Sequence, residues 1–260
     1  MQLSRLADYR NDILAALPPD EVALLRPHLI RSSMINGQSL HEAGQRIDQV
    51  YFFEQGFASL VAVANGGGAV EVGIVGRDGM LGLPVVLNPA ALSFNQAMVQ
   101  MSGLAHRMAA PKLFDCLRSA PVLAALLRQH LEVYIAQISQ TAACNSSHSP
   151  AERCARWLLI AHDRADGNEL RLTQEFLSLM LAMRRAAVTV AMQSLQTAGL
   201  VQSGRGRIQV CDRAGLEEAA CGCYGRVKAF KAAVAEAYHV ADAAAAIDGP
   251  SPGRARLARP

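Results

Sequence analysis

Residues 172–201 read LTQEFLSLMLAMRRAAVTVAMQSLQTAGLV and carry the clearest structural signal in the chain. Thr173 is a suitable N-cap for a first helix, because its hydroxyl can accept a hydrogen bond from a backbone N–H of the first turn. A second helix is predicted from about residue 184 to residue 198, and Gly199 follows it where helices favour glycine. The inner face of this second helix is apolar, with Val188, Ala191, Met192 and Leu195. The stretch therefore predicts two helices joined by a short turn.

The opposite face of the second helix is basic and polar. An α-helix fits the major groove of DNA, where an arginine can form two hydrogen bonds with guanine. In a helix-turn-helix, the start of the second helix carries the side chains that read bases. The residues expected to contact DNA here are Thr173, at the start of the first helix, and Arg184, Arg185, Thr189 and Gln193.

Two arginines follow on a glycine-flanked tip. Arg205 and Arg207 lie between two short apolar runs, 200–201 and 208–210, which predict a pair of strands. We expect both arginines to contact phosphates, which position a protein on the duplex. The alternative is a solvated helix face with ordinary surface arginines. The combination of cap, apolar inner face, paired arginines and basic tip favours DNA binding.

The preceding half of the chain has a different pattern. From residue 35 to residue 108, short apolar runs are separated by glycines, which indicates many short strands in a sandwich or barrel. Residues 58–75 predict a β-hairpin around the glycines of Asn65-Gly66-Gly67-Gly68. Before this region we expect two short helices, with Asp20 as the N-cap of the second.

A long helix is predicted between these two parts. Residues 122–148 contain neither glycine nor proline. One series of positions recurs at spacings of four and three, as in a coiled coil, and this predicts a homodimer through the helix. The alternative is a helix packed on its own domain. The series comprises Leu127, Leu131, Tyr134, Ile138 and Thr141, and residues 145–150 then form a polar hinge.

Composition narrows the class of protein. The chain has 260 residues, of which 51% are hydrophobic and 18% charged, so it can bury a core. Residues 1–148 hold ten basic and eleven acidic side chains, whereas residues 149–260 hold fifteen and eleven, so the excess positive charge lies late. With neither a secretory signal nor a long apolar run, we expect a cytoplasmic protein without a membrane anchor. No catalytic motif is recognisable, so we expect no enzyme.

The order of these elements resembles the Crp/Fnr family of bacterial transcription regulators over about residues 12–235. The most specific matches are residues 172–201, 205–217 and 47–52, together with Gly76-Arg77-Asp78-Gly79. The resemblance implies an α+β fold and a homodimer that binds a pseudo-palindromic DNA site and acts through RNA polymerase. The implied parts are a jelly-roll β-barrel sensor like a cyclic-nucleotide-binding domain (12–120), a dimerisation helix (121–148), a winged helix-turn-helix (149–218) and a C-terminal helix with a flexible tail (219–260).

The sequence departs from the family at its ligand motifs. Leu81-Gly82-Leu83-Pro84 lacks the acid that would bind a ribose, and residues 93–97 lack the arginine that would bind a phosphate. We therefore expect that cAMP is not the effector, because a phosphate buried without a cation is costly. No cysteine precedes Cys116, so we expect no iron–sulfur cluster of the family's N-terminal type. Arg185-Ala186-Ala187 replaces the usual Arg-Glu-Thr run, so the operator need not be the family's usual one.

Two alternatives stay open. Cys211, Cys221 and Cys223 could form a metal or redox site with His239 as a distant ligand, but without a second closely spaced pair we favour small apolar residues on a helix and expect no metal. The second alternative concerns function. The barrel could bind a small-molecule effector while the C-terminal domain makes protein contacts without reading DNA.

Overall fold

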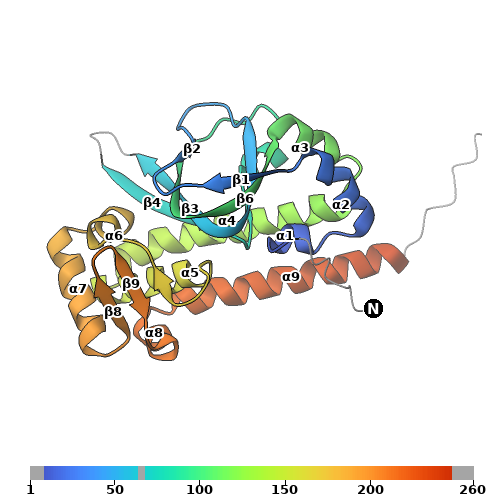
Figure 1. The fold of residues 1–260 in the computed structure, drawn as a ribbon. Helices are drawn as coiled ribbons and strands as arrows, with labels where there is room; N and C mark the ends of the chain where they lie inside the picture. Colours follow the sequence, from blue (N-terminus) through green and yellow to red (C-terminus); the bar gives the residue numbers. More distant parts are fainter. Residues whose placement is uncertain (1–8, 64–67, 248–260) are drawn as a thin grey trace, which may run out of the picture.

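The computed structural model describes residues 9–63 and 68–247 of the chain, and side chains as far as Tyr238. An antiparallel sheet forms one layer, the long helix α4 (Pro121–Ser147) runs beneath it, and a second set of helices and strands lies at the end of α4 (Figure 1). The α+β class is confirmed. Within the described ranges, every helix is too short or too polar to span a membrane.

The sheet is built on two long strands instead of many short ones. β3 (Gln49–Val63) and β6 (Gln96–Ala109) pair over most of their length, and the strand order is β1-β6-β3-β4. The other strands are β1 (Ile30–Met34), β2 (Ser39–His41), β4 (Ala69–Val75) and β5 (Met80–Leu81). The predicted hairpin is confirmed by the pairing of β3 with β4, and its tip at residues 64–67 lies outside the described residues.

Two glycines sit inside the long strands and let the strands approach closely. Gly56 has a φ of +74°, and a Cβ there would lie 2.2 Å from the carbonyl oxygen of Met101. A Cβ on Gly103 would lie 2.1 Å from the carbonyl oxygen of Gln55. The register of β3 against β6 shifts at this place. The expectation that these glycines separate strands was therefore wrong, because they permit an irregular crossing within one strand pair.

Short helices cover the start of the sheet domain. α1 (Asp12–Ala15) is capped by the side chain of Asn11, and α2 (Pro19–Leu25) begins after Pro18. Asp20 lies inside the first turn of α2, so its prediction as the N-cap was wrong. The Glu21 carboxylate instead caps α4, accepting hydrogen bonds of 2.8 Å from two backbone N–H groups. The remaining elements are η1 (Arg26–His28), η2 (Leu83–Val86) and α3 (Ala110–Cys116).

The C-terminal domain follows α4 after two residues. α5 (Pro150–His162) begins with a capping box, in which Ser149 and Glu152 each hydrogen bond to the other's backbone. A three-stranded sheet of order β7-β9-β8 then flanks the two predicted helices. These elements are β7 (Glu169–Leu170), α6 (Gln174–Met180), α7 (Arg185–Thr197), β8 (Val201–Gly204), β9 (Arg207–Val210) and α8 (Arg213–Ala219). The sequence did not predict β7, which is only two residues long.

The last helix returns along the long helix. α9 (Cys223–Ile247) packs antiparallel beside α4 (Figure 1). The Tyr238 hydroxyl near its far end donates a 3.0 Å hydrogen bond to Glu132 of α4. The flexible tail was predicted to begin after Ala241, but α9 continues to Ile247, so that start was wrong. Residues 248–260 lie outside the described residues.

A buried contact joins the two domains. Trp157 of α5 packs in one apolar cluster with Phe57 of β3, and its indole N–H donates a 2.6 Å hydrogen bond to Glu71 of β4. Two ion pairs reinforce the contact. Arg164 lies 2.7 Å from Asp78, and the Arg10–Asp166 pair lies on the surface.

Candidate nucleic-acid interface

The turn between α6 and α7 is tight and fixed by backbone geometry. Ala182 adopts a left-handed conformation with a φ of +48°, which is uncommon for a residue with a Cβ. The Met183 N–H then donates a 3.0 Å hydrogen bond to the Ser178 carbonyl, and Arg184 is the extended N-cap of α7. The chain therefore starts α7 at the position that the sequence predicted.

α7 buries one face and exposes the other. Its buried side chains are Val188, Ala191, Met192 and Leu195, as predicted, and they share a core with α5. Gly199 follows the helix with a φ of +74°, which confirms the predicted helix end. This apolar anchoring fixes which side chains of α7 point to solvent.

Three of the predicted contact residues are free on that outer face. Arg184, Arg185 and Gln193 are exposed, and in the described part of the chain their side chains take part in no hydrogen bond or ion pair. An unpaired guanidinium at the start of an exposed helix presents its donors to a ligand without first breaking another contact. This geometry is suited to hydrogen bonding with base edges or phosphates.

The two predicted threonines are partly used within the domain. The Thr189 hydroxyl donates a 3.0 Å hydrogen bond to the Arg185 carbonyl and lies 3.4 Å from the Gln174 amide oxygen of α6. Thr173 caps α6, accepting a 3.1 Å hydrogen bond from the Phe176 N–H, and stays exposed. Thr189 thus links the two helices, while Thr173 fixes the start of α6.

The basic tip forms as a two-residue turn between β8 and β9. Gly206 supplies the positive φ of +67°, and Arg205 beside it is exposed. Arg207 lies 3.7 Å from Glu169 of β7, which also lies 3.4 Å from Arg171. Both pairs are solvent-exposed and contribute little energy, so DNA phosphates could displace them. Arg171 directly precedes the quoted stretch 172–201 and was not among the residues predicted to contact DNA.

An apolar residue also lies on the outer face of α7. The Val190 side chain is 66% exposed, which is high for a valine in a folded domain. In the major groove, apolar side chains contact the methyl group of thymine. The predicted DNA contacts included only charged and polar side chains, so Val190 was not among them.

The five residues of the predicted dimer series differ in how deeply they are buried in the folded chain. Leu127 is fully buried in its own chain, and Leu131 and Tyr134 pack against the sheet-domain core. Ile138 and Thr141 are half-buried. The alternative of packing on the chain's own domain therefore holds for Leu127. A neighbouring side chain that the series omitted, Ile135, is 56% exposed.

A cavity lies where α4, α5 and α9 meet. Its volume is about 570 Å³, and it is lined by His130, Tyr134, Arg164 and Lys231 among others. Burial lowers the pKa of His130 to about 4, and the Asp78 carboxylate beside it opposes that shift. The cavity combines apolar walls with a few charged groups, as small-molecule sites do.

The cysteines are arranged differently from either prediction. Cys211 is exposed, and the side chain of His239 lies outside the described residues. Cys221 and Cys223 instead meet two residues at the end of α4, Cys144 and His148. Burial raises the pKa of the Cys144 thiol. It also raises the pKa of the Cys221 thiol, to about 12. The sequence offered two signals for this grouping: the close pair Cys221 and Cys223, which was noted, and the spacing of four between Cys144 and His148 on a helix, which was not.

Comparison with known proteins places this architecture. The model of the Crp-like helix-turn-helix domain matches residues 152–219. No curated protein matches the sequence. Among solved structures, FixK2 from Bradyrhizobium japonicum is similar with a TM-score of 0.63 at 15% identity, over 74% of this chain and 98% of that chain.

Two further structures agree. The c-di-GMP responsive global regulator CLP from Xanthomonas campestris has a TM-score of 0.59 at 14% identity, over 74% of this chain and 99% of that one. A crp/fnr family transcriptional regulator from Eubacterium rectale has a TM-score of 0.59 at 18% identity, over 80% and 96%. Residues 152–219 therefore belong to the Crp-like helix-turn-helix family, and the chain as a whole has the fold of the Crp/Fnr transcription regulators.

Proposed function

We propose that the protein is a sequence-specific transcription regulator that binds a pseudo-palindromic operator as a homodimer and acts through RNA polymerase. The observation that carries the proposal is the exposed face of α7, where Arg184 and Arg185 are unpaired at the start of the helix. The family match to residues 152–219 supports DNA binding by this domain.

The residues divide by what they would contact. Arg184, Arg185 and Gln193 would read base edges in the major groove, with Thr189 holding α7 against α6 and contacting the groove at its edge. The start of α6 and the tip of the β8–β9 turn would lie along the backbone. Thr173, Arg205 and Arg207 would therefore bind phosphates, which supply affinity without sequence information.

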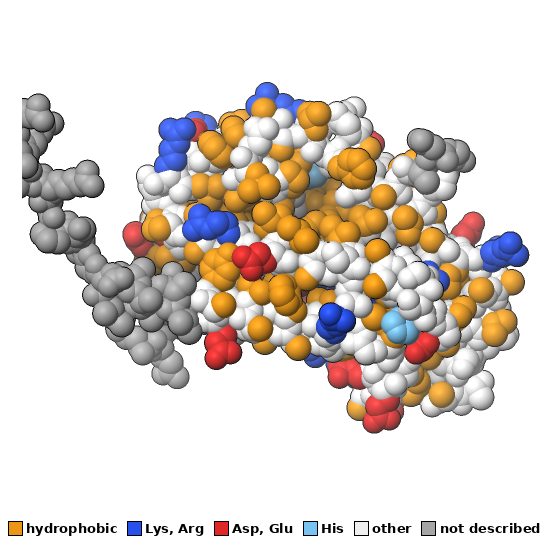
Figure 2. All heavy atoms as spheres, turned by 180° about the vertical axis from the view of Figure 1, so that it is seen from behind, with side chains coloured by type: hydrophobic (Ala, Val, Ile, Leu, Met, Phe, Trp, Pro, Cys, Tyr) orange, Lys and Arg blue, Asp and Glu red, His pale blue; other side chains and the backbone are white. Residues whose placement is uncertain are grey.

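The homodimer would form along α4. Hydrophobic side chains gather across the middle of the face shown in Figure 2, which lies opposite the view of Figure 1. Val122 and Ile135 of α4 are exposed. An extended apolar surface supports an interface, because monomeric proteins rarely leave large apolar patches in water. We expect Ile135, Ile138 and Thr141 to contribute to it, with Leu127, Leu131 and Tyr134 supporting the helix from behind.

The effector would not be cAMP. Phe52 and Phe53 are fully buried in the apolar clusters of the sheet domain. Phe94, in the segment without the phosphate-binding arginine, is 88% exposed. The cavity between α4, α5 and α9 is the stronger candidate for a small-molecule effector, since helices of both domains line it. Calorimetric titration with cAMP should give no heat of binding.

Selection of bound fragments from random duplex DNA tests the proposal. We expect a two-fold symmetric consensus, with half-sites about one helical turn apart. Binding should weaken steeply as salt rises, because phosphate contacts release counterions. A chain that selects no consensus and binds duplex DNA no better than an unrelated protein would overturn the proposal. That outcome would favour an effector-binding module that acts through protein contacts.

A further inference from the structure

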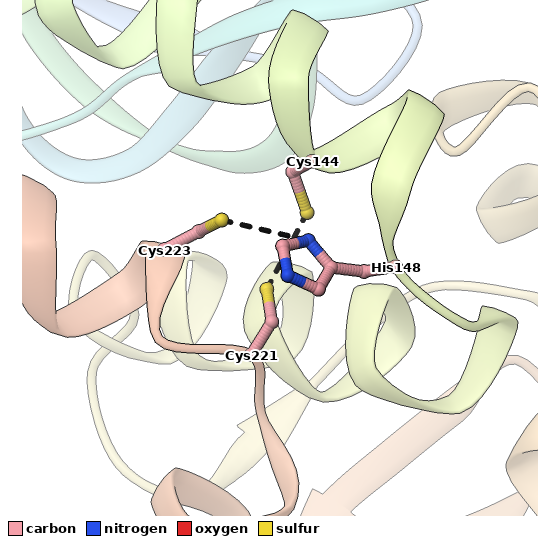
Figure 3. Close-up of side chains that lie close together, drawn as sticks. All are labelled: Cys144, His148, Cys221 and Cys223. Carbon is pink, nitrogen blue, oxygen red and sulfur yellow. Dashed lines mark hydrogen bonds between the residues drawn. The ribbon is translucent and has the colours of Figure 1, made fainter.

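Four side chains with metal-binding atoms converge at the joint between the two domains. Cys144 and His148 lie one turn apart at the end of α4, Cys221 lies just before α9, and Cys223 is its first residue. Their side chains point toward one another (Figure 3). The four ligand atoms all lie within 4.8 Å of one another. Residues about 75 apart in the sequence thus meet in one place.

The distances match the edges of a small tetrahedron. The Sγ atoms of Cys144 and Cys221 are 3.4 Å apart, and Cys223 Sγ lies 3.6 Å from Nδ1 of His148. In a tetrahedral zinc site with Zn–S bonds of about 2.3 Å, two sulfurs lie about 3.8 Å apart and a sulfur and a nitrogen about 3.6 Å. An iron–sulfur cluster would hold at least some of its four ligands farther apart, since they are divided between two or more irons.

We propose that Cys144, His148, Cys221 and Cys223 form a mononuclear Cys3His site for a tetrahedral divalent metal ion, with Zn²⁺ as the preferred ion. Three thiolates and an imidazole are the ligand set of structural zinc sites. On binding, each thiol gives its proton to solvent, and the metal takes its place. All four ligands come from the protein, so the site is closed and structural.

The surroundings fit a site that becomes anionic. The amide nitrogen of Gln140 donates a 3.0 Å hydrogen bond to Cys223 Sγ, as groups around metal ligands commonly do. Arg156 is buried and lies close enough to act electrostatically on Cys144. Its Nε has no hydrogen-bond partner among the described residues. Three thiolates, a neutral imidazole and Zn²⁺ carry one net negative charge, which Arg156 would balance.

A disulfide between Cys144 and Cys221 is the competing use of these thiols. It would draw the two sulfurs to about 2.05 Å. It would not explain why Cys223 and His148 face each other. It would also not explain the hydrogen bond from Gln140 to Cys223 Sγ, which would stabilise a thiolate. The metal site accounts for all four side chains and for the buried arginine.

The position gives the site a consequence for the whole protein. It ties the end of α4 to the start of α9 at the residues where the chain turns into α5. Metal binding would fix the C-terminal domain relative to α4. This step rests on the proposed function, and it predicts that metal loading sets the affinity for the selected operator.

Metal content of the full chain tests the site directly. After incubation with excess Zn²⁺ and desalting, we expect one zinc per chain. Co²⁺ in its place should give the strong visible bands of tetrahedral thiolate coordination. Cys221→Ser should abolish both signals, whereas Cys211→Ser, at an exposed cysteine, should keep them. Gln140→Ala should lower the metal affinity about 10-fold to 100-fold while keeping one equivalent at saturation.

The outcomes separate the site from the proposed function. A chain that stays metal-free and shows no cobalt bands overturns the site, as does equal metal content in Cys221→Ser and Cys211→Ser. A Cys144–Cys221 disulfide in peptide maps of freshly purified protein also overturns it. Circular dichroism of Cys221→Ser distinguishes lost ligation from failed folding. If metal binds but no operator is selected, the site stands and the proposed function fails.

Discussion

Two arginines of the C-terminal domain are expected to contact a bound duplex in different ways, and substitutions should distinguish them. Arg185 begins the exposed face of α7, so Arg185→Ala should weaken operator binding by about 1–3 kcal/mol and relax the preference at one base. Arg207 is the first residue of β9, beside the β8–β9 turn, so Arg207→Ala should weaken binding to all sequences alike and lower the salt slope by about one. Arg118→Ala, at an exposed arginine after α3, serves as the control. Binding to operator and scrambled duplexes over a salt series gives both quantities. Unchanged base preference in Arg185→Ala would show that α7 sits in the groove in another register.

At the scale of elements, the crossing of β3 and β6 leaves no room for an added methyl group at Gly56. Gly56→Ala adds a Cβ 2.2 Å from a backbone oxygen at a positive φ, so the strands must part. We expect a loss of more than about 1 kcal/mol in the free energy of unfolding. Gly37→Ala is the matched control, because Gly37 also has a positive φ, +81°, but nothing lies within 4 Å of the added atom. Urea denaturation measures both variants. If they lose equal stability, backbone conformation alone accounts for Gly56, and the close approach is unimportant.

The elements also show what the sequence could predict. The helix-turn-helix and the β8–β9 turn follow local rules of capping, periodicity and glycine conformation, so residues 172–210 were predicted almost as they fold. The crossing at Gly56 depends on a strand some 45 residues away, and the sequence suggested only a glycine between strands. The cysteine cluster depends on α9 returning along α4. A long-range contact of this kind leaves no periodic pattern, which is why the metal-site alternative considered His239 and not His148, and why we expected no metal.

At the scale of the whole molecule, a buried carboxyl links the stability of the domain contact to pH. Burial raises the pKa of Glu71 from 4.5 to about 7, against the hydrogen bonds from Ser59 and Trp157. Between these values the folded chain holds a proton that the unfolded chain has lost, so stability should fall as pH rises from about 4.5 to about 7. The full effect is about 3 kcal/mol. Glu71→Gln keeps an acceptor for the Trp157 N–H but cannot ionise. The difference in unfolding free energy between the two proteins, measured from pH 4.5 to pH 8, isolates Glu71 from other groups such as His130. A difference that does not change with pH would contradict the shift.

Only His148 and Ser149 separate the end of α4 from the start of α5. So short a joint leaves the chain few torsion angles with which to reorient everything beyond it. A modest rotation there would swing the far side of the C-terminal domain through a wide arc, as a lever amplifies motion at its pivot. In a two-fold symmetric dimer, the C-terminal domains of both protomers would rotate in opposite senses. A small rotation would therefore change the distance between the two α7 helices.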